Sequence, residues 1–159
     1  MNLFVTGANG YIGGNFIKKA LAKGYKIFAL TRKKKNKKIK NVKWLVGGID
    51  KNWKELKRTD ILIHLAAVGG YSRFSTFKKC YNFNVLKSKK LVENSVSNGC
   101  NKLLIISSKK EKKIKNLEIN KNQIKNYEKK PDYIYALTKA IFSKFCFDFS
   151  KKNDVKIRI

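Results

Sequence analysis

A glycine-rich turn near the amino terminus constrains this chain more than any other feature. The apolar run Leu3-Phe4-Val5 leads into Thr6-Gly7-Ala8-Asn9-Gly10-Tyr11-Ile12-Gly13, after which apolar residues recur at helical spacing. Glycines let a backbone turn tightly and approach a ligand closely, and a helix that begins there presents free N–H groups and the positive end of its dipole. A strand, a glycine turn and a helix in this order predict a seat for a pyrophosphate.

Apolar runs alternate with amphipathic segments along the rest of the chain. The pattern predicts six strands, at Asn2–Thr6, Lys26–Thr31, Val42–Val46, Ile61–Leu65, Lys102–Ser107 and Val155–Ile159. Helical spacing fits Tyr11–Lys23, about Phe77–Asn98, and Pro131 to about Lys151. Strands in alternation with helices favour an α/β fold with a doubly wound parallel sheet, formed by one domain over residues 1–159.

Glycines and charged runs mark the ends of these segments. Gly24 and Gly99 stand just past two of the predicted helices, where a left-handed cap favours glycine. Two lysine-rich stretches, Arg32–Lys40 and Lys109–Lys130, are predicted to be surface loops.

The charge of the chain raises the question of a nucleic-acid partner. The formal net charge is +28 and 43% of the 159 residues are hydrophobic, which favours a folded domain over disorder. Lysine supplies nearly all of the 38 basic residues and is spread along the whole sequence. Readers of bases and phosphates rely on arginine forks. Solvated lysine faces are therefore preferred over a specific nucleic-acid site, with a basic nucleic-acid-binding protein as an alternative.

The three cysteines indicate a reducing compartment. Cys80, Cys100 and Cys146 are far apart and form no Cys-x-x-Cys pair, so we expect reduced thiols, no metal site and a cytoplasmic location. No uncharged run approaches the length of a membrane span, so no membrane association is expected.

A second motif lies near the carboxyl terminus. Tyr135 and Lys139 are four residues apart in a predicted helix and therefore share one face. A nearby cation favours phenolate and lowers the pKa of a tyrosine from about 10, which makes Tyr135 a candidate proton donor or acceptor in a hydroxyl/carbonyl interconversion. The alternative is a packing tyrosine beside an unrelated lysine. The position of the pair after Ser107-Ser108, at the end of a strand, favours the first interpretation.

Taken together, these landmarks resemble the extended short-chain dehydrogenase/reductase family of NAD(P)-dependent sugar-nucleotide epimerases and dehydratases. The matching motifs occur in order: Thr6-Gly7-x-x-Gly10-x-x-Gly13, the strand and small-residue turn Asp60–Ala67, Asn84-Val85, Ile106-Ser107-Ser108, and Tyr135-x-x-x-Lys139. The resemblance covers essentially the whole chain and implies a Rossmann fold. It also implies a nucleotide-sugar substrate, and a homodimer is compatible with it.

The resemblance assigns roles residue by residue. Tyr135 would be the general acid/base, Lys139 would hold the nicotinamide ribose, and Ser108 would hydrogen-bond the reacting oxygen. Asn84 would brace the site through backbone hydrogen bonds, whereas His64 is expected to be a satisfied core residue. The expected cofactor-binding residues are Gly7, Asn9, Gly10, Tyr11, Ile12, Gly13, Thr31, Arg32, Leu65, Ala66, Ala67, Asn84 and Lys139.

The end of the second strand decides which cofactor is expected. An acidic residue there would bind the ribose 2′-hydroxyl of NAD, and an arginine favours the 2′-phosphate of NADP. The sequence Thr31-Arg32-Lys33 contains no carboxylate, so NADP is expected, with NAD as the alternative.

The sequence also departs from the family pattern. Family members continue into a C-terminal half that supplies most of the nucleotide-sugar pocket, so this chain looks truncated to the Rossmann half, and turnover could be weak or absent. Lys109 stands where relatives with three serines place the catalytic one, whereas the shorter pattern assigns Ser108. Gly48 replaces the acid usually found before the adenine-contacting residue, although Asp50 follows closely. A non-catalytic NAD(P)-binding protein, acting as a sensor or a partner-binding module, is therefore the main alternative.

Overall fold

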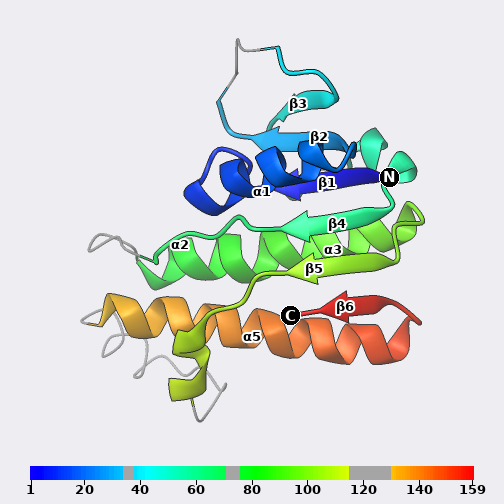
Figure 1. Cartoon of the computed structure of the whole chain (residues 1–159). Coiled ribbons are helices and arrows are strands. Elements are labelled where there is room, and N and C mark those ends of the chain that lie inside the picture. Colours follow the sequence, from blue (N-terminus) through cyan, green and yellow to red (C-terminus); the bar gives the residue numbers. More distant parts are fainter. Residues whose placement is uncertain (34–37, 71–75, 115–129) are drawn as a thin grey trace.

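The computed structural model describes residues 1–33, 38–70, 76–114 and 130–159, and these build one parallel sheet (Figure 1). Its strand order is β3-β2-β1-β4-β5-β6, and every neighbouring pair is parallel. The strands are β1 (Asn2–Thr6), β2 (Lys26–Thr31), β3 (Val42–Val46), β4 (Ile61–His64), β5 (Lys102–Ile105) and β6 (Lys156–Arg158). The predicted doubly wound sheet and its six strands are confirmed.

Helices connect the strands and cover both faces of the sheet. They are α1 (Tyr11–Ala22), α2 (Phe77–Tyr81), α3 (Ser88–Ser97) and α5 (Pro131–Lys152), with the short 3₁₀ segments η1 (Lys54–Arg58) and η3 (Lys109–Lys113) and a π-helical turn η2 (Asn82–Lys87). The glycines after α1 and α3 have left-handed backbones, with φ of 76° at Gly24 and 87° at Gly99, as predicted.

Alternate residues of the strands form two separate cores, as parallel strands covered on both faces require. Leu3 and Val5 of β1 face one side and pack with Ile17 of α1. Phe4 of β1 faces the other side, where Leu91 of α3 contributes to the same core; the remaining buried members there include Leu62, Leu103, Phe142 and Cys146. This arrangement places the carboxyl ends of β1, β2 and β4 side by side at one edge.

Three strands are shorter than predicted. β6 covers Lys156–Arg158 rather than Val155–Ile159, and the two others end early for identifiable reasons. β4 ends at His64 rather than Leu65 because the N–H groups of Leu65 and Ala66 donate to the hydroxyl of Thr6, each at 3.2 Å. β5 ends at Ile105 rather than Ser107, since Ser108 caps η3. Residues Lys109–Lys113, which were predicted to lie in a loop, therefore form a 3₁₀ turn.

The helix predicted over Phe77–Asn98 contains a wide π-helical turn, which divides it into α2, η2 and α3. The hydroxyl of Thr76 accepts a hydrogen bond from the N–H of Lys79 and begins α2. After the π turn η2, the hydroxyl of Ser88 donates to the carbonyl of Phe83, five residues earlier, at 3.0 Å. Such turns occur often at functional sites.

Further expectations concern the loops, the membrane and the cysteines. The parts of the predicted loops at 34–37 and 115–129 lie outside the described residues. Within the described ranges, none of the helices combines the length and the apolar character that crossing a membrane would need. Cys80, Cys100 and Cys146 are all buried and form no disulfide among the described residues.

Candidate functional site

The glycine turn is packed so closely that side chains are excluded from it. Gly7 has a φ of 68°, and a Cβ on it would lie 2.8 Å from the amide nitrogen of Ala66. A Cβ on Gly13 would lie 2.2 Å from the carbonyl oxygen of Gly7, which also accepts a hydrogen bond from the N–H of Gly10 at 2.9 Å. The turn therefore brings its backbone against the end of β4 in a way that only glycine permits.

A buried hydrogen-bond chain fixes the strand ends beneath this turn. The hydroxyl of Thr6 accepts from two N–H groups, so its own proton goes to Nδ1 of His64 at 2.7 Å. Nε2 of His64 then carries the ring proton and donates to Ser88 at 3.1 Å. Burial, helped by the charge of Lys139, lowers the pKa of His64 to about 3. His64 is thus a neutral, satisfied core residue, as predicted.

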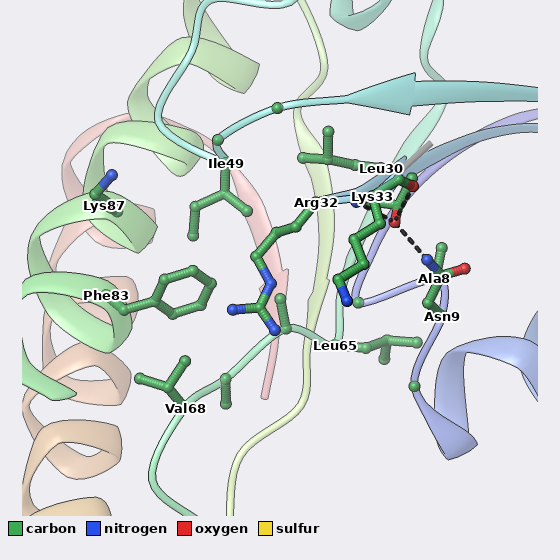
Figure 2. A pocket seen from close by; sticks show the side chains of 17 residues that line it. Ala8, Asn9, Leu30, Arg32, Lys33, Ile49, Leu65, Val68, Phe83 and Lys87 are labelled. Atoms are coloured by element: carbon green, nitrogen blue, oxygen red, sulfur yellow. Dashed lines mark hydrogen bonds between the residues drawn. The ribbon is translucent and has the colours of Figure 1, made fainter. Parts of the chain in front are cut away.

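A cavity of about 910 Å³ opens above the glycine turn, at the point where the strand order reverses between β1 and β4 (Figure 2). Ligands of open α/β sheets bind at such a switch point. The cavity is lined by Gly7, Ala8, Asn9, Gly10, Leu30, Thr31, Arg32, Lys33, Gly47, Gly48, Ile49, Leu65, Ala66, Ala67, Val68, Phe83 and Lys87.

Its walls combine apolar side chains with cations. Figure 2 shows the side chains of Arg32 and Lys33 reaching from the end of β2 into the cavity, which Leu65, Val68 and Phe83 also line. The amide of Asn9 donates to the hydroxyl of Thr31, which also accepts from the N–H of Lys33. This bond ties the glycine turn to the end of β2 and holds the backbone that carries both cations.

Most residues expected to bind the cofactor line this cavity. They are Gly7, Asn9, Gly10, Thr31, Arg32, Leu65, Ala66 and Ala67. Tyr11 and Ile12 begin α1 outside the lining, with exposed fractions of 88% and 58%. Gly13 acts through its packing on Gly7 instead of lining the cavity.

Asn84 lies behind the cavity wall and braces it. Its side-chain oxygen accepts from the N–H of Val68 and its amide donates to the carbonyl of Val68, both at 2.9 Å. The amide also donates to the hydroxyl of Thr138 on α5 at 3.1 Å. The bracing by backbone hydrogen bonds that was expected of Asn84 is thus present in the structure.

Nine lining residues were not among the expected cofactor-binding residues: Ala8, Leu30, Lys33, Gly47, Gly48, Ile49, Val68, Phe83 and Lys87. Phe83 and Lys87 are four residues apart on the helical segment that carries Asn84. That spacing was the available signal, because residues at i and i+4 share a helix face.

The predicted catalytic residues lie on α5 and after β5, outside the cavity lining. Tyr135 is half-buried, and its ring lies against Gly70, where an added Cβ would be 3.7 Å from the ring. Lys139, one turn later, is only 3% exposed and donates from Nζ to the carbonyl of Ile106 at 2.5 Å. Burial lowers the pKa of Lys139, and the charge of Glu111 opposes that shift.

Ser108 is the N-cap of η3. Its hydroxyl accepts from the N–H of Lys110 at 3.2 Å, and the carboxylate of Glu111 accepts from the N–H of Ser108 and from the hydroxyl of Ser107. The structure therefore brings Ser107, Ser108 and Glu111 together beside Lys139, through bonds within the chain.

Residues 3–159 match the model of the NAD dependent epimerase/dehydratase family. The chain belongs to this family. No curated protein matches the sequence. Among solved structures of similar fold, UDP-glucose 4-epimerase from Thermotoga maritima, determined with UDP-glucose, is 18% identical with a TM-score of 0.74.

Two further structures show the same fold. UDP-glucuronic acid 4-epimerase from Bacillus cereus, in complex with NAD, is 20% identical with a TM-score of 0.75, and Gre2 from Candida albicans, in complex with NADPH, is 21% identical with a TM-score of 0.77. The alignments cover 99% of this family member and 53%, 54% and 55% of the three proteins, in the order given. The chain thus spans about half the length of these structures.

Proposed function

We propose that this chain is the NAD(P)-binding half of an epimerase/dehydratase-type oxidoreductase and that it favours NADP. The observation that carries the proposal is the glycine turn, in which Gly7 and Gly13 leave space for no Cβ below a cavity at the switch point. Free N–H groups at the start of α1 and an apolar-walled cavity suit a pyrophosphate and a flat base, so the residues present fit a dinucleotide.

Two cations support NADP over NAD. Arg32 and Lys33 follow β2 and line the cavity, where a 2′-phosphate would gain charge-assisted hydrogen bonds. The similar structures contain NAD in the UDP-sugar epimerase from Bacillus cereus and NADPH in Gre2. The preference therefore rests on this chain's own residues.

For the reaction, we propose hydride transfer from a carbon of a nucleotide-sugar. A bound nicotinamide would supply the hydride acceptor. Tyr135 would take the proton of the substrate hydroxyl, since it is half-buried and one turn from the ammonium of Lys139. Ser108, fixed by its capping bonds, would orient the reacting oxygen. The three cysteines form no disulfide among the described residues, which supports the proposed cytoplasmic location.

A fluorescence titration with NADPH and NADH tests the proposal. We expect binding of both, about tenfold tighter for NADPH, and loss of that preference in Arg32→Ala, because a charge-assisted bond to the 2′-phosphate is removed. Arg158→Ala is the matched control, since it removes an arginine from β6, away from the cavity. Absence of binding to either dinucleotide would contradict the proposal.

A cofactor-binding protein without turnover is the second candidate. It is favoured by the bonds that already occupy the amine of Lys139 and the hydroxyl of Ser108 within the chain. Tyr135→Phe separates the two candidates: an enzyme loses turnover while its dinucleotide affinity is unchanged, whereas a sensor keeps every function that can be measured.

A further inference from the structure

Glu111 lies among the predicted catalytic residues, and the reaction proposed above gives its carboxylate no role. One oxygen of that carboxylate, Oε1, accepts from the hydroxyl of Ser107 and from the N–H of Ser108, the latter at 3.3 Å. The hydroxyl of Ser108 accepts from the N–H of Lys110, so its own proton is not used in that bond. A single carboxylate therefore fixes the turn that carries the predicted catalytic serine.

The same turn is attached to α5 beside the predicted catalytic lysine. The hydroxyl of Ser107 lies 3.4 Å from that of Ser143, which stands one helical turn after Lys139. Nζ of Lys139 donates to the carbonyl of Ile106 at 2.5 Å. Two consecutive residues after β5 thus contact two consecutive turns of α5, and Glu111 holds the second of them.

The electrostatic surroundings of Lys139 give Glu111 a second role. Lys139 is 3% exposed, and its Nζ lies 5.9 Å from the centroid of the Phe142 ring. The titratable groups that act on it are the carboxylate of Glu111 on η3, the thiol of Cys146 on α5 and the imidazole of His64 on β4. The imidazole is neutral, and burial raises the pKa of the Cys146 thiol to about 12, so the thiol is neutral as well. Of these three groups, Glu111 is the one that supplies a negative charge.

We propose that Glu111 is a positioning residue of the proposed active site, where it holds Ser108 in place and supplies the countercharge of the Lys139 ammonium. An ammonium has three N–H donors, and the bond to Ile106 uses one of them. The charged form can therefore hold the strand end and still donate to the nicotinamide ribose. This inference rests on the proposed function and goes beyond it, because it names a residue that acts through Ser108 and Lys139.

The pKa of Lys139 gives the inference a measurable consequence. Burial lowers this pKa, and the charge of Glu111 opposes the shift. Removal of the Glu111 charge should therefore let Lys139 lose its proton at a lower pH. The neutral amine is a weaker donor than the ammonium, so the affinity for the dinucleotide should fall with it.

The experiment separates the charge of Glu111 from its hydrogen bonds. Glu111→Gln keeps the shape, and its amide oxygen can still accept from Ser107 and Ser108. The dissociation constant for NADPH is measured by fluorescence titration at pH 7 and pH 9.5. We expect the variant and the unmodified protein to bind about equally at pH 7, and the variant to bind about threefold more weakly or worse at pH 9.5. Other lysines of the cavity titrate in both proteins, so their effect cancels in this ratio.

Two comparisons show whether the effect passes through Lys139. In the Lys139→Met background, Glu111→Gln should change the affinity by the same factor at both pH values, since no ammonium remains. Glu93→Gln, which removes a carboxylate from the ion pair with Lys90 on α3, is the matched control and should follow the unmodified protein. A pH-dependent ratio that persists without Lys139 would show that Glu111 acts on another group, and the inference would be wrong.

A merely structural role of Glu111 gives a different result. It would weaken NADPH binding by the same factor at pH 7 and pH 9.5, which would overturn this inference and leave the proposed function intact. A protein that binds no dinucleotide at either pH would overturn both. Glu111→Asp keeps the charge on a shorter side chain and should retain the pH dependence of the unmodified protein. Circular dichroism and the melting temperature of each variant show whether its fold is intact.

Discussion

Two regions at the carboxyl ends of the strands, a glycine side and a serine side, are held in place by different kinds of interaction. At the glycine side, formed by Thr6–Gly13 and the end of β4, backbone atoms pack against backbone atoms and exclude any Cβ at Gly7 and Gly13. At the serine side, formed by Ser107, Ser108, Glu111 and Lys139, polar side chains bond to each other and to strand ends. The first arrangement leaves no space for a side chain at Gly7 or Gly13, whereas the second depends on hydrogen bonds between polar side chains.

The largest expected effect is at Gly13 on the glycine side. In Gly13→Ala the new Cβ would meet backbone atoms of Gly7 and Ala8, which cannot rotate away, so we expect a loss of about 3 kcal/mol or more in the free energy of unfolding. Gly14→Ala is the matched control, because no atom lies within 4 Å of its Cβ; it should gain up to about 1 kcal/mol. Equal effects in urea denaturation would contradict the steric account.

Asn84 joins the two sides, and its loss ranks next. Asn84→Ala leaves the N–H and carbonyl of Val68 without their side-chain partners and should cost about 2–3 kcal/mol in chemical denaturation. Thr138→Val removes the bond from Asn84 to α5, together with the bond from the Thr138 hydroxyl to the carbonyl of Tyr135, and should cost about 1 kcal/mol. The double variant should cost less than the sum of the two, since both single changes break the same bond; simple additivity would mean that Asn84 does not couple the sides.

His64 makes the stability of the glycine side depend on pH. It is the single histidine of the chain, and its pKa falls to about 3 because burial disfavours the charged ring. The unfolded chain binds a proton at His64 below about pH 6.5, whereas the folded chain does not bind it until about pH 3. The free energy of unfolding is therefore highest above pH 6.5 and falls between pH 6.5 and pH 3 by about 1.4 kcal/mol per pH unit.

Two measurements check this pH dependence. Imidazole NMR should show a ring that stays neutral at pH 5 in the folded protein. The stability of His64→Gln should fall less steeply between pH 6 and pH 4 than that of the unmodified protein. A ring that titrates near pH 6.5 would show that the Thr6–His64–Ser88 chain does not persist in solution.

The smallest expected effect concerns Lys139 on the serine side. Its pKa is lowered by burial, so at neutral pH the folded state carries an ammonium that is costly to desolvate. Lys139→Met should therefore raise the free energy of unfolding at pH 7 by about 1 kcal/mol, and the gain should shrink as pH rises toward 10.5. Glu111→Gln should have the opposite sign, since Glu111 raises that pKa. A stability loss in Lys139→Met would show that its bond to Ile106 outweighs desolvation.

The sequence predicted features that depend on neighbours along the chain. The glycine turn, the six strands and the caps at Gly24 and Gly99 follow from local spacing and backbone freedom. The early end of β5 was not predicted, because it depends on the capping of η3 by Ser108 and on the amine of Lys139 taking the carbonyl of Ile106. Local patterns do not contain such contacts.

Contacts between residues that are far apart in the sequence also explain why some residues of the cavity were not predicted. The carboxylate of Asp50 lies over Gly48 and is bonded by Lys87, 37 residues later in the sequence. Phe83 and Lys87 enter the lining through a π turn, and the hydrophobic spacing of that segment fits an ordinary helix equally well. The roles of Tyr135, Lys139 and Ser108 stay predictions, since their functional groups lie outside the lining.

The π turn at Asn82–Lys87 also changes the rotational phase of the helix that contains it. An extra residue within one turn rotates everything beyond it by about 100°. Before the turn, Phe77 and Cys80 pack with Ile134 and Leu137 of α5; after it, Leu91 and Val92 belong to the core beneath the sheet. The helical segment from α2 to α3 thereby packs against two cores, whereas a regular helix of the same length would not direct these residues into both. Deleting one residue here would turn one of those faces toward water, so the length of this segment is as constrained as its composition.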